Sequence, residues 1–594
     1  MPTLKNKTLS AIIIGACAFH VVNVNAQTEP KPWVAKSNSY TKTLIDISEK
    51  YSPEFGSSQG LAKYDTLVAV PTLANDLAER KERETALASL MSAKQKETDK
   101  FVKQDLDILI NQLALSFKNE DFSLNKKVPF LNATATVFSG LQSLLDDQTP
   151  VERRAAAVIR LNKYAGLQKG YEPISAIYKA RTLEQIAKPG TIYPSKQATE
   201  VSLSRNASML AGIEGLFKKY KVTGYETAYA AIKKQLEDYD AWVKATILPK
   251  ARTDFRLPPE EYKLNLEGYG IDIPPAEVAK MAHAAFTDIQ AQMKPLAEQI
   301  AKKYNLPSSD YREVIKFLKK KQIIGDSIMP IYQKHLADIE AIIREQHLVT
   351  LPNRPAIIRL ASEAETAQSP APHMVPPPFL NNTGQRGVFV LPLNMPPAPG
   401  EKVDKYDDFT FDAASWTIIA HEARPGHELQ FDKMVEEGVS QARALYAFNS
   451  TNVEGWGLYS EYITRPFMPV EGQLVSLDYR LLRAARAFLD PELQAGTITQ
   501  EQALNLLMTD VVQSHAFAQQ EVQRYSLNAP GQANSYFYGF TKMIALRQDV
   551  EKIQGAKFNQ QRFHDFILSQ GILPPALLRQ AVMTDFLMLE GRRF

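Results

Sequence analysis

The chain has 594 residues, of which 44% are hydrophobic and 23% are charged, so it is long and apolar enough to bury a large core. Its formal net charge of +3 gives no reason to expect nucleic acid or an anionic membrane as the main partner. A single cysteine, Cys17, excludes a disulfide framework within the chain and zinc sites built from several thiolates.

The first 26 residues have the pattern of an export signal. Two lysines precede an apolar stretch at residues 9–22, and Ala26 offers a cleavage site. We therefore expect a signal peptide at 1–26 and a periplasmic or secreted mature chain without cysteine, in which a metal needs His, Asp or Glu ligands. Two alternatives remain open. The first is that the segment is an uncleaved membrane anchor. The second is that Cys17 carries a lipid, which would make the protein a lipoprotein.

Helical periodicity dominates the sequence that follows the signal. Apolar residues three and four positions apart indicate helices over much of residues 44–250 and again at 276–304. Two more helices are expected within 311–346, whereas the stretch 257–274 is expected to be irregular. No stretch after the signal approaches about 18 uninterrupted apolar residues, so we expect no membrane span in the mature chain.

The pattern changes at the proline-rich stretch 369–378. The short apolar run 388–391 comes next and ends at a proline, which predicts an edge strand able to pair with an extended peptide. From residue 411 the helical pattern returns, with breaks expected near Pro466, Pro491, Pro530 and Pro574. The sequence therefore predicts a mainly α protein with a small edge β-sheet, an N-terminal helical half at 27–260 and a catalytic half at 261–594.

Two histidines lie six residues apart in the sequence HEARPGH, residues 421–427. The common helical zinc motif places its histidines at i and i+4, on one helix face. Because six residues of ideal helix turn through about 240°, His421 and His427 could not meet at one ion on a straight helix. Pro425 and Gly426 favour a deformed backbone, so we predict a kink that brings the second histidine back beside the first. The alternative is two ordinary, partly buried histidines near a helix break.

A possible third ligand follows in the sequence TNVEGWGLYSE, residues 451–461. Glu454 stands on the predicted next helix, but its spacing from the threonine three residues before it also fits a capping box. Gly455 and Gly457 weaken the capping alternative, because glycine is a poor helix former that lets a backbone approach a neighbour closely. Glu461 is either a carboxylate that orients a histidine ligand or a solvated residue.

These two elements together resemble a known bacterial family. The pattern His-Glu-x-x-Pro-Gly-His-x-x-Gln followed by Glu-Gly-Trp-x-x-Tyr-x-Glu resembles the family catalogued as domain of unknown function 885. That family is similar in architecture to helical zinc peptidases such as thimet oligopeptidase, thermostable carboxypeptidases and angiotensin-converting enzyme. The resemblance has specific motifs over residues 376–594, and it implies a long-helix, zincin-like fold with a deep central cleft.

The resemblance also implies roles for individual residues. Zinc (Zn2+) would be the cofactor, held by His421, His427 and Glu454. Glu422 would act as the general base. Beyond the resemblance, Tyr536 is a candidate donor to the oxyanion, and the alternative is a core tyrosine that packs beside its aromatic neighbours. His515 is a second candidate donor, although an exposed or core histidine is the simpler interpretation. Arg524 or Arg547 would bind a substrate carboxylate, although solvated arginines are the simpler interpretation.

The expected function is zinc-dependent hydrolysis of short peptides, with attack by a water molecule that Glu422 deprotonates. One alternative is a non-catalytic peptide-binding or scaffold protein of the same fold. Another is a metal-dependent amide hydrolase with non-peptide substrates. The presence of Glu422 argues against a pure binder, because binding alone needs no general base.

Overall fold

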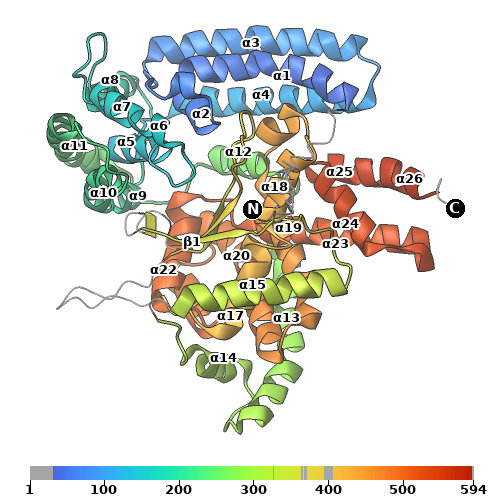
Figure 1. The fold of residues 1–594 in the computed structure, drawn as a ribbon. Coiled ribbons are helices and arrows are strands. Elements are labelled where there is room, and N and C mark those ends of the chain that lie inside the picture. Colours follow the sequence, from blue (N-terminus) through green and yellow to red (C-terminus); the bar gives the residue numbers. More distant parts are fainter. Residues whose placement is uncertain are drawn as a thin grey trace, which may run out of the picture.

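The computed structural model describes residues 31–324, 327–362, 365, 366, 369, 371–392 and 406–591. The predicted signal peptide, residues 1–26 with Cys17, lies outside the described residues. The described part is mainly helical and has a small three-stranded sheet, as predicted (Figure 1). Within it, no helix is both long enough and apolar enough to cross a membrane.

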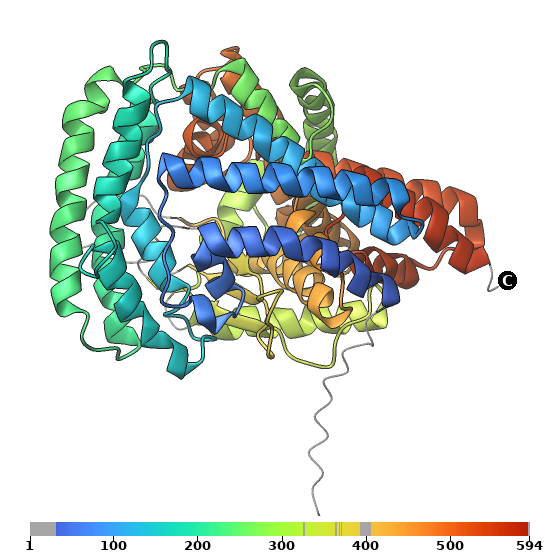
Figure 2. The ribbon, with the colours of Figure 1, turned by 90° about the horizontal axis from the view of Figure 1, so that it is seen from above.

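Three long N-terminal helices lie side by side as a layer over one side of the molecule (Figures 1 and 2). The layer consists of α1 (Pro32–Tyr51), α3 (Leu73–Lys96) and α4 (Lys100–Lys126), with the short α2 (Pro53–Ser58) after α1. Asp99 caps α4, since its side chain accepts hydrogen bonds from the first backbone N–H groups of that helix. Leu106, Leu109 and Leu113 recur at helical spacing on α4 and are buried against the layer.

The next helices form a second bundle beside this layer and have a hydrophobic core of their own (Figures 1 and 2). They are α5 (Ala133–Gln142), α6 (Val151–Arg154), α7 (Ala156–Tyr164), α8 (Ile174–Ile186), α9 (Lys196–Ser204), α10 (Asn206–Lys219) and α11 (Glu226–Thr246). The helical pattern predicted across 44–250 is therefore present, divided by turns into many separate helices.

The two predicted halves, 27–260 and 261–594, share buried contacts. Ile108 of α4 belongs to the main core of the C-terminal half. Arg443 donates a hydrogen bond of 2.8 Å from Nε to Asp105 Oδ1 on α4, and both side chains are buried. The N-terminal helices are thus packed against the half that carries the candidate site, while the boundary near residue 260 stays a prediction.

The stretch 257–274, expected to be irregular, is instead mostly helical. It contains α12 (Pro259–Tyr269), which starts at a proline and ends at Gly270 with φ 87°. Proline fits the first turn of a helix because the N–H that it lacks would have no helical partner there, and glycine fits a left-handed C-terminal cap. The prediction was wrong because it interpreted Pro258 and Pro259 as helix breaks, whereas they mark the start of a helix.

The C-terminal half is built on long helices. The predicted helix at 276–304 is α13, and it packs along most of α20. After α12, the described helices of this half include α13 (Pro275–Tyr304), α14 (Tyr311–Lys319), α15 (Ile328–Glu345), α17 (Asp412–Glu422), α18 (His427–Glu436), α19 (Ser450–Thr464), α20 (Val470–Ala495), α21 (Gln500–Thr509), α22 (His515–Gln523), α23 (Asn534–Gln554), α24 (Gln560–Ser569), α25 (Pro575–Ala581) and α26 (Leu587–Gly591).

Pro491 does not end a helix, contrary to the prediction. It lies inside α20, which continues to Ala495 and ends at Gly496 with φ 75°. Proline removes one backbone hydrogen bond from a helix interior. Most residues of α20 are buried between neighbouring helices, and this packing keeps the segment helical past the proline.

The sheet corrects the prediction made for residues 388–391. Its strands are β1 (Ile357–Leu360), β2 (His373–Val375) and β3 (Val388–Leu391), in the spatial order β1-β3-β2. β3 is therefore the central strand, parallel to β1 and antiparallel to β2, and all four of its residues are buried. A run of consecutive apolar residues is typical of a strand buried on both faces. Because both edges of β3 are paired, it cannot take a peptide as an added strand.

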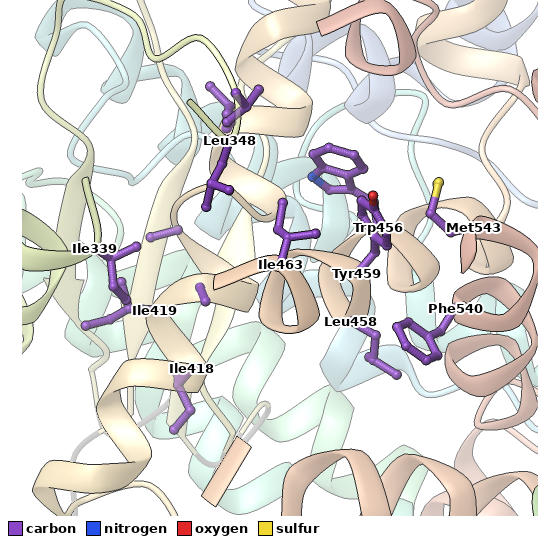
Figure 3. Packing of buried hydrophobic residues seen from close by; sticks show 14 of the residues in the cluster. Ile339, Leu348, Ile418, Ile419, Trp456, Leu458, Tyr459, Ile463, Phe540 and Met543 are labelled. Atoms are coloured by element: carbon purple, nitrogen blue, oxygen red, sulfur yellow. The ribbon is translucent and has the colours of Figure 1, made fainter. Parts of the chain in front are cut away.

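Two of the three helices that carry the candidate ligands, α17 and α19, pack in one hydrophobic cluster (Figure 3). Ile418 and Ile419 of α17 and Trp456 and Ile463 of α19 are among its buried members. Burial of large apolar side chains stabilises such a cluster by about 1.5–3 kcal/mol per residue. This packing fixes α17 and α19 relative to each other before any ligand is considered.

Candidate metal centre

The chain bends sharply between the two histidines. α17 ends one residue after His421, and α18 begins at His427. A Cβ atom at Gly426 would lie 1.8 Å from the carbonyl oxygen of His421, so only glycine fits the bend. The two imidazole rings lie 4.6 Å apart between centroids, which confirms the predicted deformation at Pro425-Gly426.

His421, His427 and Glu454 converge on one point, and their ligand atoms all lie within 4.8 Å of one another. Glu454 Oε2 is 3.3 Å from Nε2 of His421 and 3.5 Å from Nε2 of His427. Ligand atoms about 2 Å from a tetrahedral zinc ion lie about 3.3 Å apart. Glu454 Oε2 is buried, and among the described residues neither histidine contact has the geometry of a hydrogen bond, so this charged oxygen still lacks a well-formed partner. The donor set therefore fits zinc.

Each histidine is oriented through its other ring nitrogen. Nδ1 of His421 lies 2.7 Å from Oε1 of Glu461, whose second oxygen accepts a hydrogen bond of 2.7 Å from Thr417. Nδ1 of His427 lies 3.4 Å from Oε1 of Gln430. Both rings thereby direct Nε2 toward Glu454, and the orienting role considered for Glu461 is confirmed as a contact.

The same contacts shift the pKa values of the buried groups. Burial alone would lower the pKa of His421, but Glu454 and Glu461 raise it to about 9. Burial alone would raise the pKa of Glu454, but the nearby His421 and His427 hold it well below its usual range. In the absence of metal His421 therefore retains a proton at neutral pH, and a metal ion would take that proton's place.

The capping alternative for Glu454 is wrong. The N-cap of α19 is Asn449, whose side chain accepts a hydrogen bond from Asn452 N, and Thr451 instead donates to the carbonyl oxygen of Tyr269. Since the cap is supplied elsewhere, the Glu454 carboxylate remains directed at the histidines.

The glycines of the same segment allow close approach, as predicted. A Cβ atom at Gly457 would lie 2.5 Å from the His421 ring, and one at Gly455 would lie 2.6 Å from the backbone of Gly539 on α23. α19 is thus pressed against the imidazole on one side and against a neighbouring helix on the other. Larger side chains at these positions would push Glu454 away from the histidines.

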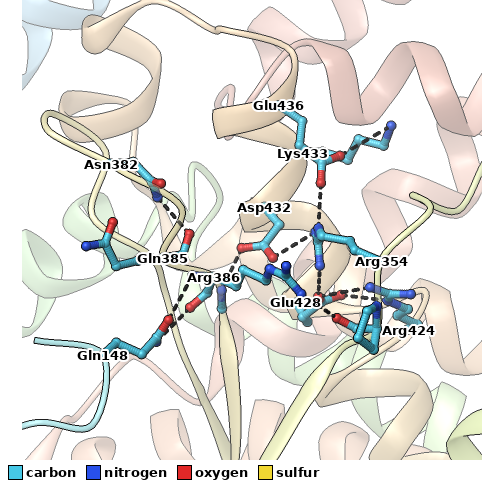
Figure 4. A network of polar contacts seen from close by, with 12 residues as sticks. Gln148, Arg354, Asn382, Gln385, Arg386, Arg424, Glu428, Asp432, Lys433 and Glu436 are labelled. Atoms are coloured by element: carbon cyan, nitrogen blue, oxygen red, sulfur yellow. Dashed lines mark hydrogen bonds and ion pairs between the residues drawn. The ribbon is translucent and has the colours of Figure 1, made fainter. Parts of the chain in front are cut away.

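A buried ionic network supports the bend (Figure 4). Arg424, within the bend, donates to Glu428 at 2.8 Å and to Glu340 at 2.5 Å. Glu428 also accepts a hydrogen bond of 2.5 Å from Arg354, which forms a further ion pair of 2.7 Å with Asp432. Glu428 follows His427 directly on α18, so the network fixes the start of the helix that carries this ligand.

The predicted catalytic side chains lie in a small pocket of about 90 Å3 beside the histidines. Glu422 and Tyr536 both line it together with His421. The Tyr536 ring lies parallel to the His421 ring, with centroids 6.4 Å apart, and its Oη accepts a hydrogen bond of 2.8 Å from Arg524. Burial raises the pKa of Tyr536 above its usual value despite the opposing charge of Arg524, so the phenol is neutral at ordinary pH.

Two other predicted residues are not part of this group. His515 is exposed at the start of α22 and is not among the residues that line the pocket. Phe517, on the same helix, does line the pocket. Arg547 contacts Tyr459 and Glu551 instead of the pocket. The structure thus brings Glu422 and Tyr536 to the histidines but does not bring His515.

The sequence analysis did not identify Arg483 and Arg486 as residues of the pocket. Both lie on α20 and line the pocket next to Arg524. Their signal in the sequence is the i, i+3 spacing of two arginines on a helix that is otherwise apolar on most sides, since buried arginines need a partner or a function.

Two solved structures share this fold. One, from Shewanella oneidensis, is described as a candidate lipoprotein of unknown function and has 19% identity and a TM-score of 0.70 over 93% of this chain and 100% of that chain. The other, described as a candidate lipoprotein from Colwellia psychrerythraea, has 17% identity and a TM-score of 0.70 over 93% of this chain and 97% of that chain. Comparison with curated proteins gives no match.

The family comparison covers both halves of the chain. Residues 53–582 match the bacterial proteins of unknown function that form the family DUF885. The match extends well before residue 376, where the specific motifs begin, so the N-terminal helices are part of what defines the family. This chain belongs to the DUF885 family of bacterial proteins.

Proposed function

We propose that this protein is a zinc-dependent peptidase that hydrolyses short peptides. The observation that carries the proposal is the convergence of His421, His427 and Glu454 within 4.8 Å, next to a pocket lined by Glu422 and Tyr536. Zinc in such a site supplies Lewis acidity, which polarises a scissile carbonyl and lowers the pKa of the attacking water. The zincin-like architecture with a deep central cleft is part of this proposal.

Glu422 is the proposed general base. It follows His421 in the last turn of α17, lines the pocket and does not belong to the ligand cluster. Its carboxylate is therefore available to take a proton from the attacking water and to pass it to the leaving amine. A residue in this role need not bind the metal, so its loss separates catalysis from metal binding.

Tyr536 is the proposed donor to the oxyanion. Arg524 donates its N–H to Tyr536 Oη, so the phenolic hydrogen itself remains available to donate into the pocket. The guanidinium groups of Arg486 and Arg524 lie 4.7 and 5.1 Å from the centre of the Tyr536 ring. These positive charges would stabilise negative charge that develops on the substrate carbonyl oxygen.

Short peptides in the periplasm or outside the cell are the proposed substrates. Both similar structures are described as candidate lipoproteins, which supports the alternative that Cys17, outside the described residues, carries a lipid anchor. Either arrangement places the enzyme outside the cytoplasm. A mass measurement of the mature protein distinguishes cleavage after Ala26 from lipidation at Cys17.

Metal analysis combined with a peptide digest tests the proposal. The wild type, Glu422→Gln and a control, Glu501→Gln at an exposed position on α21, are purified without chelator and incubated with a mixture of short peptides. Products are identified by mass spectrometry. We expect about one zinc per chain in all three proteins and a loss of turnover of about 100-fold or more in Glu422→Gln alone. Wild-type protein without bound metal would overturn the proposal.

The alternatives give other results in the same experiment. Bound zinc with peptide binding but no turnover in any of the three proteins would support a non-catalytic binding protein. Bound zinc with hydrolysis of small amides but not of peptides would support an amide hydrolase acting on non-peptide substrates.

A further inference from the structure

Three arginines line the pocket beside the metal centre: Arg483, Arg486 and Arg524. The first two lie on α20, and Arg524 is the first residue of a π-helical turn, η6 (Arg524–Asn528), that follows α22. Arginine side chains in the interior of a protein need a partner of opposite charge. The surrounding carboxylates therefore show which of the three arginines already has a partner within the chain.

Arg486 has a complete partner. Its Nε and Nη2 donate to the two carboxylate oxygens of Glu521 at 2.5 and 2.9 Å, and both side chains are buried. Such a two-point pair satisfies both charges in full. The charge of Arg486 is therefore already compensated by Glu521, so we do not expect Arg486 to bind a further anion.

Arg483 lacks a carboxylate of its own. Its nearest, Glu461, is 3.4 Å from Nη2 and is already bonded to His421 and Thr417. Nη1 donates to a neutral backbone carbonyl, that of Tyr479, at 3.1 Å. Nε is buried and has no hydrogen-bond partner in the part of the chain that the structure describes. The side chain is 9% exposed, so water cannot fully compensate for the missing partner.

Arg524 is in a similar position. Its nearest carboxylate, Glu521, is 3.7 Å away and is already bound to Arg486 and to the hydroxyl of Tyr525. The hydrogen bonds that Arg524 donates go to neutral groups, the amide of Gln532 and the hydroxyl of Tyr536. Two guanidinium groups in one pocket thus share carboxylates that other groups already use.

We propose that Arg483 and Arg524 bind a carboxylate of the substrate, so that preferred peptides carry a negative charge close to the scissile bond. The carboxylate assignment rests on the proposed function. An incoming carboxylate would give these two cations the partner that the chain does not supply, through charge-assisted hydrogen bonds. The carboxylate has two possible sources: the free C-terminus of a peptide, as for a carboxypeptidase, or an acidic side chain.

Binding calorimetry on zinc-loaded Glu422→Gln tests the assignment without turnover. The probes are acetyl-Ala-Ala-Phe with a free carboxylate, the same peptide as its C-terminal amide, and acetyl-Ala-Ala-Glu amide. We expect a charged peptide to bind about 10- to 100-fold more tightly than the neutral amide. Tighter binding of the free acid identifies the C-terminus as the source, and tighter binding of the Glu amide identifies the side chain.

Substitutions separate recognition from structural effects. In Glu422→Gln proteins that also carry Arg483→Gln or Arg524→Lys, we expect the preference for the charged peptide to fall about tenfold or more, while zinc content is retained. The matched control is Arg480→Gln, one turn earlier on α20, where the guanidinium lies 4.8 Å from the centre of the Phe540 ring and does not line the pocket. This control should keep the full preference.

The outcomes distinguish this inference from the proposed function. Equal binding of all three peptides, together with peptide turnover by the wild type, overturns the carboxylate assignment and leaves the peptidase proposal standing. Tighter binding of a charged peptide that depends on Arg483 and Arg524, without turnover in the wild type, supports the assignment and counts against the peptidase. A preference that survives both substitutions overturns the assignment of these residues.

Discussion

Gly457 lies directly against the imidazole of His421. A Cβ atom on Gly457 would meet the ring at 2.5 Å from Cε1 and 2.8 Å from Nε2, the nitrogen that faces Glu454. The absence of a side chain at this position therefore sets how closely α19 approaches α17. Since α19 also carries Glu454, the glycine controls the geometry of the whole ligand cluster.

Replacing this glycine should damage the metal site more than the fold. In Gly457→Ala we expect the His421 ring to be displaced and zinc affinity to fall about 10-fold or more, measured by competition with a fluorescent chelator. Gly268→Ala in α12 is the control, because a Cβ atom there meets nothing within 4 Å. Unchanged affinity in Gly457→Ala would contradict the close contact between Gly457 and the His421 ring.

Glu461 offers a more conservative test of the same ligand. Its Oε1 lies 2.7 Å from Nδ1 of His421, and it also accepts a hydrogen bond from Thr417. Glu461→Gln keeps the shape but removes the charge, so we expect zinc affinity to fall about 10- to 100-fold. Glu501→Gln, exposed on α21, should leave affinity unchanged in the same titration. Equal affinities in the two variants would show that the contact does not tune the metal.

Local sequence features predicted the geometry of the candidate metal centre. Pro425 and Gly426 predicted a bend between the histidines, and Gly455 and Gly457 predicted a close approach by the next helix. Each of these residues acts through backbone geometry, which is a property of the residue type itself. The approach of Glu461 to His421 followed from the same helix register, seven residues beyond Glu454.

Other features depend on contacts between distant segments and could not be predicted. The carboxylates nearest to Arg483 and Arg524 come from two different helices, α19 and α22, and no spacing in the sequence reveals which carboxylates are shared. The central position of β3 depends on β1 and β2, which surround it from either side in space. Pro491 stays helical because of the packing around α20, and packing regularly outweighs local preference.

The network behind the bend gives a prediction about stability. Glu428 is fully buried and bonded to both Arg424 and Arg354. Removal of one member of a buried ion pair leaves uncompensated charge, so we expect Glu428→Ala to lower the free energy of unfolding by about 3–5 kcal/mol, measured by urea denaturation of the metal-free protein. Asp46→Ala, which breaks an exposed pair with Lys42, is the control and should have little effect. A small effect at Glu428 would mean that the network does not hold α18 in place.

His564 gives a prediction about pH. It is fully buried, its Nδ1 lies 2.6 Å from the carbonyl oxygen of Leu348 and its Nε2 lies 2.7 Å from the hydroxyl of Tyr459. Burial lowers its pKa to about 3, so the folded protein keeps it neutral where the unfolded chain, with a pKa of about 6.5, takes up a proton. Stability should therefore fall as pH drops below about 6.5, by about 1.3 kcal/mol for this one group between pH 7 and 5.5.

The contribution of His564 is isolated by comparing two proteins at both pH values. Urea unfolding of the metal-free wild type and of His564→Gln, with chelator present throughout, gives a difference in unfolding free energy in which the other titrating groups cancel. The variant should be less stable at pH 7, because it loses the two contacts of His564. In the wild type, protonation of this histidine in the unfolded chain lowers the free energy of unfolding at acidic pH, and this effect is absent from the variant. The difference between the proteins should therefore shrink by about 1.3 kcal/mol at pH 5.5. A difference that stays constant would mean that His564 is protonated as readily in the folded protein as in the unfolded chain.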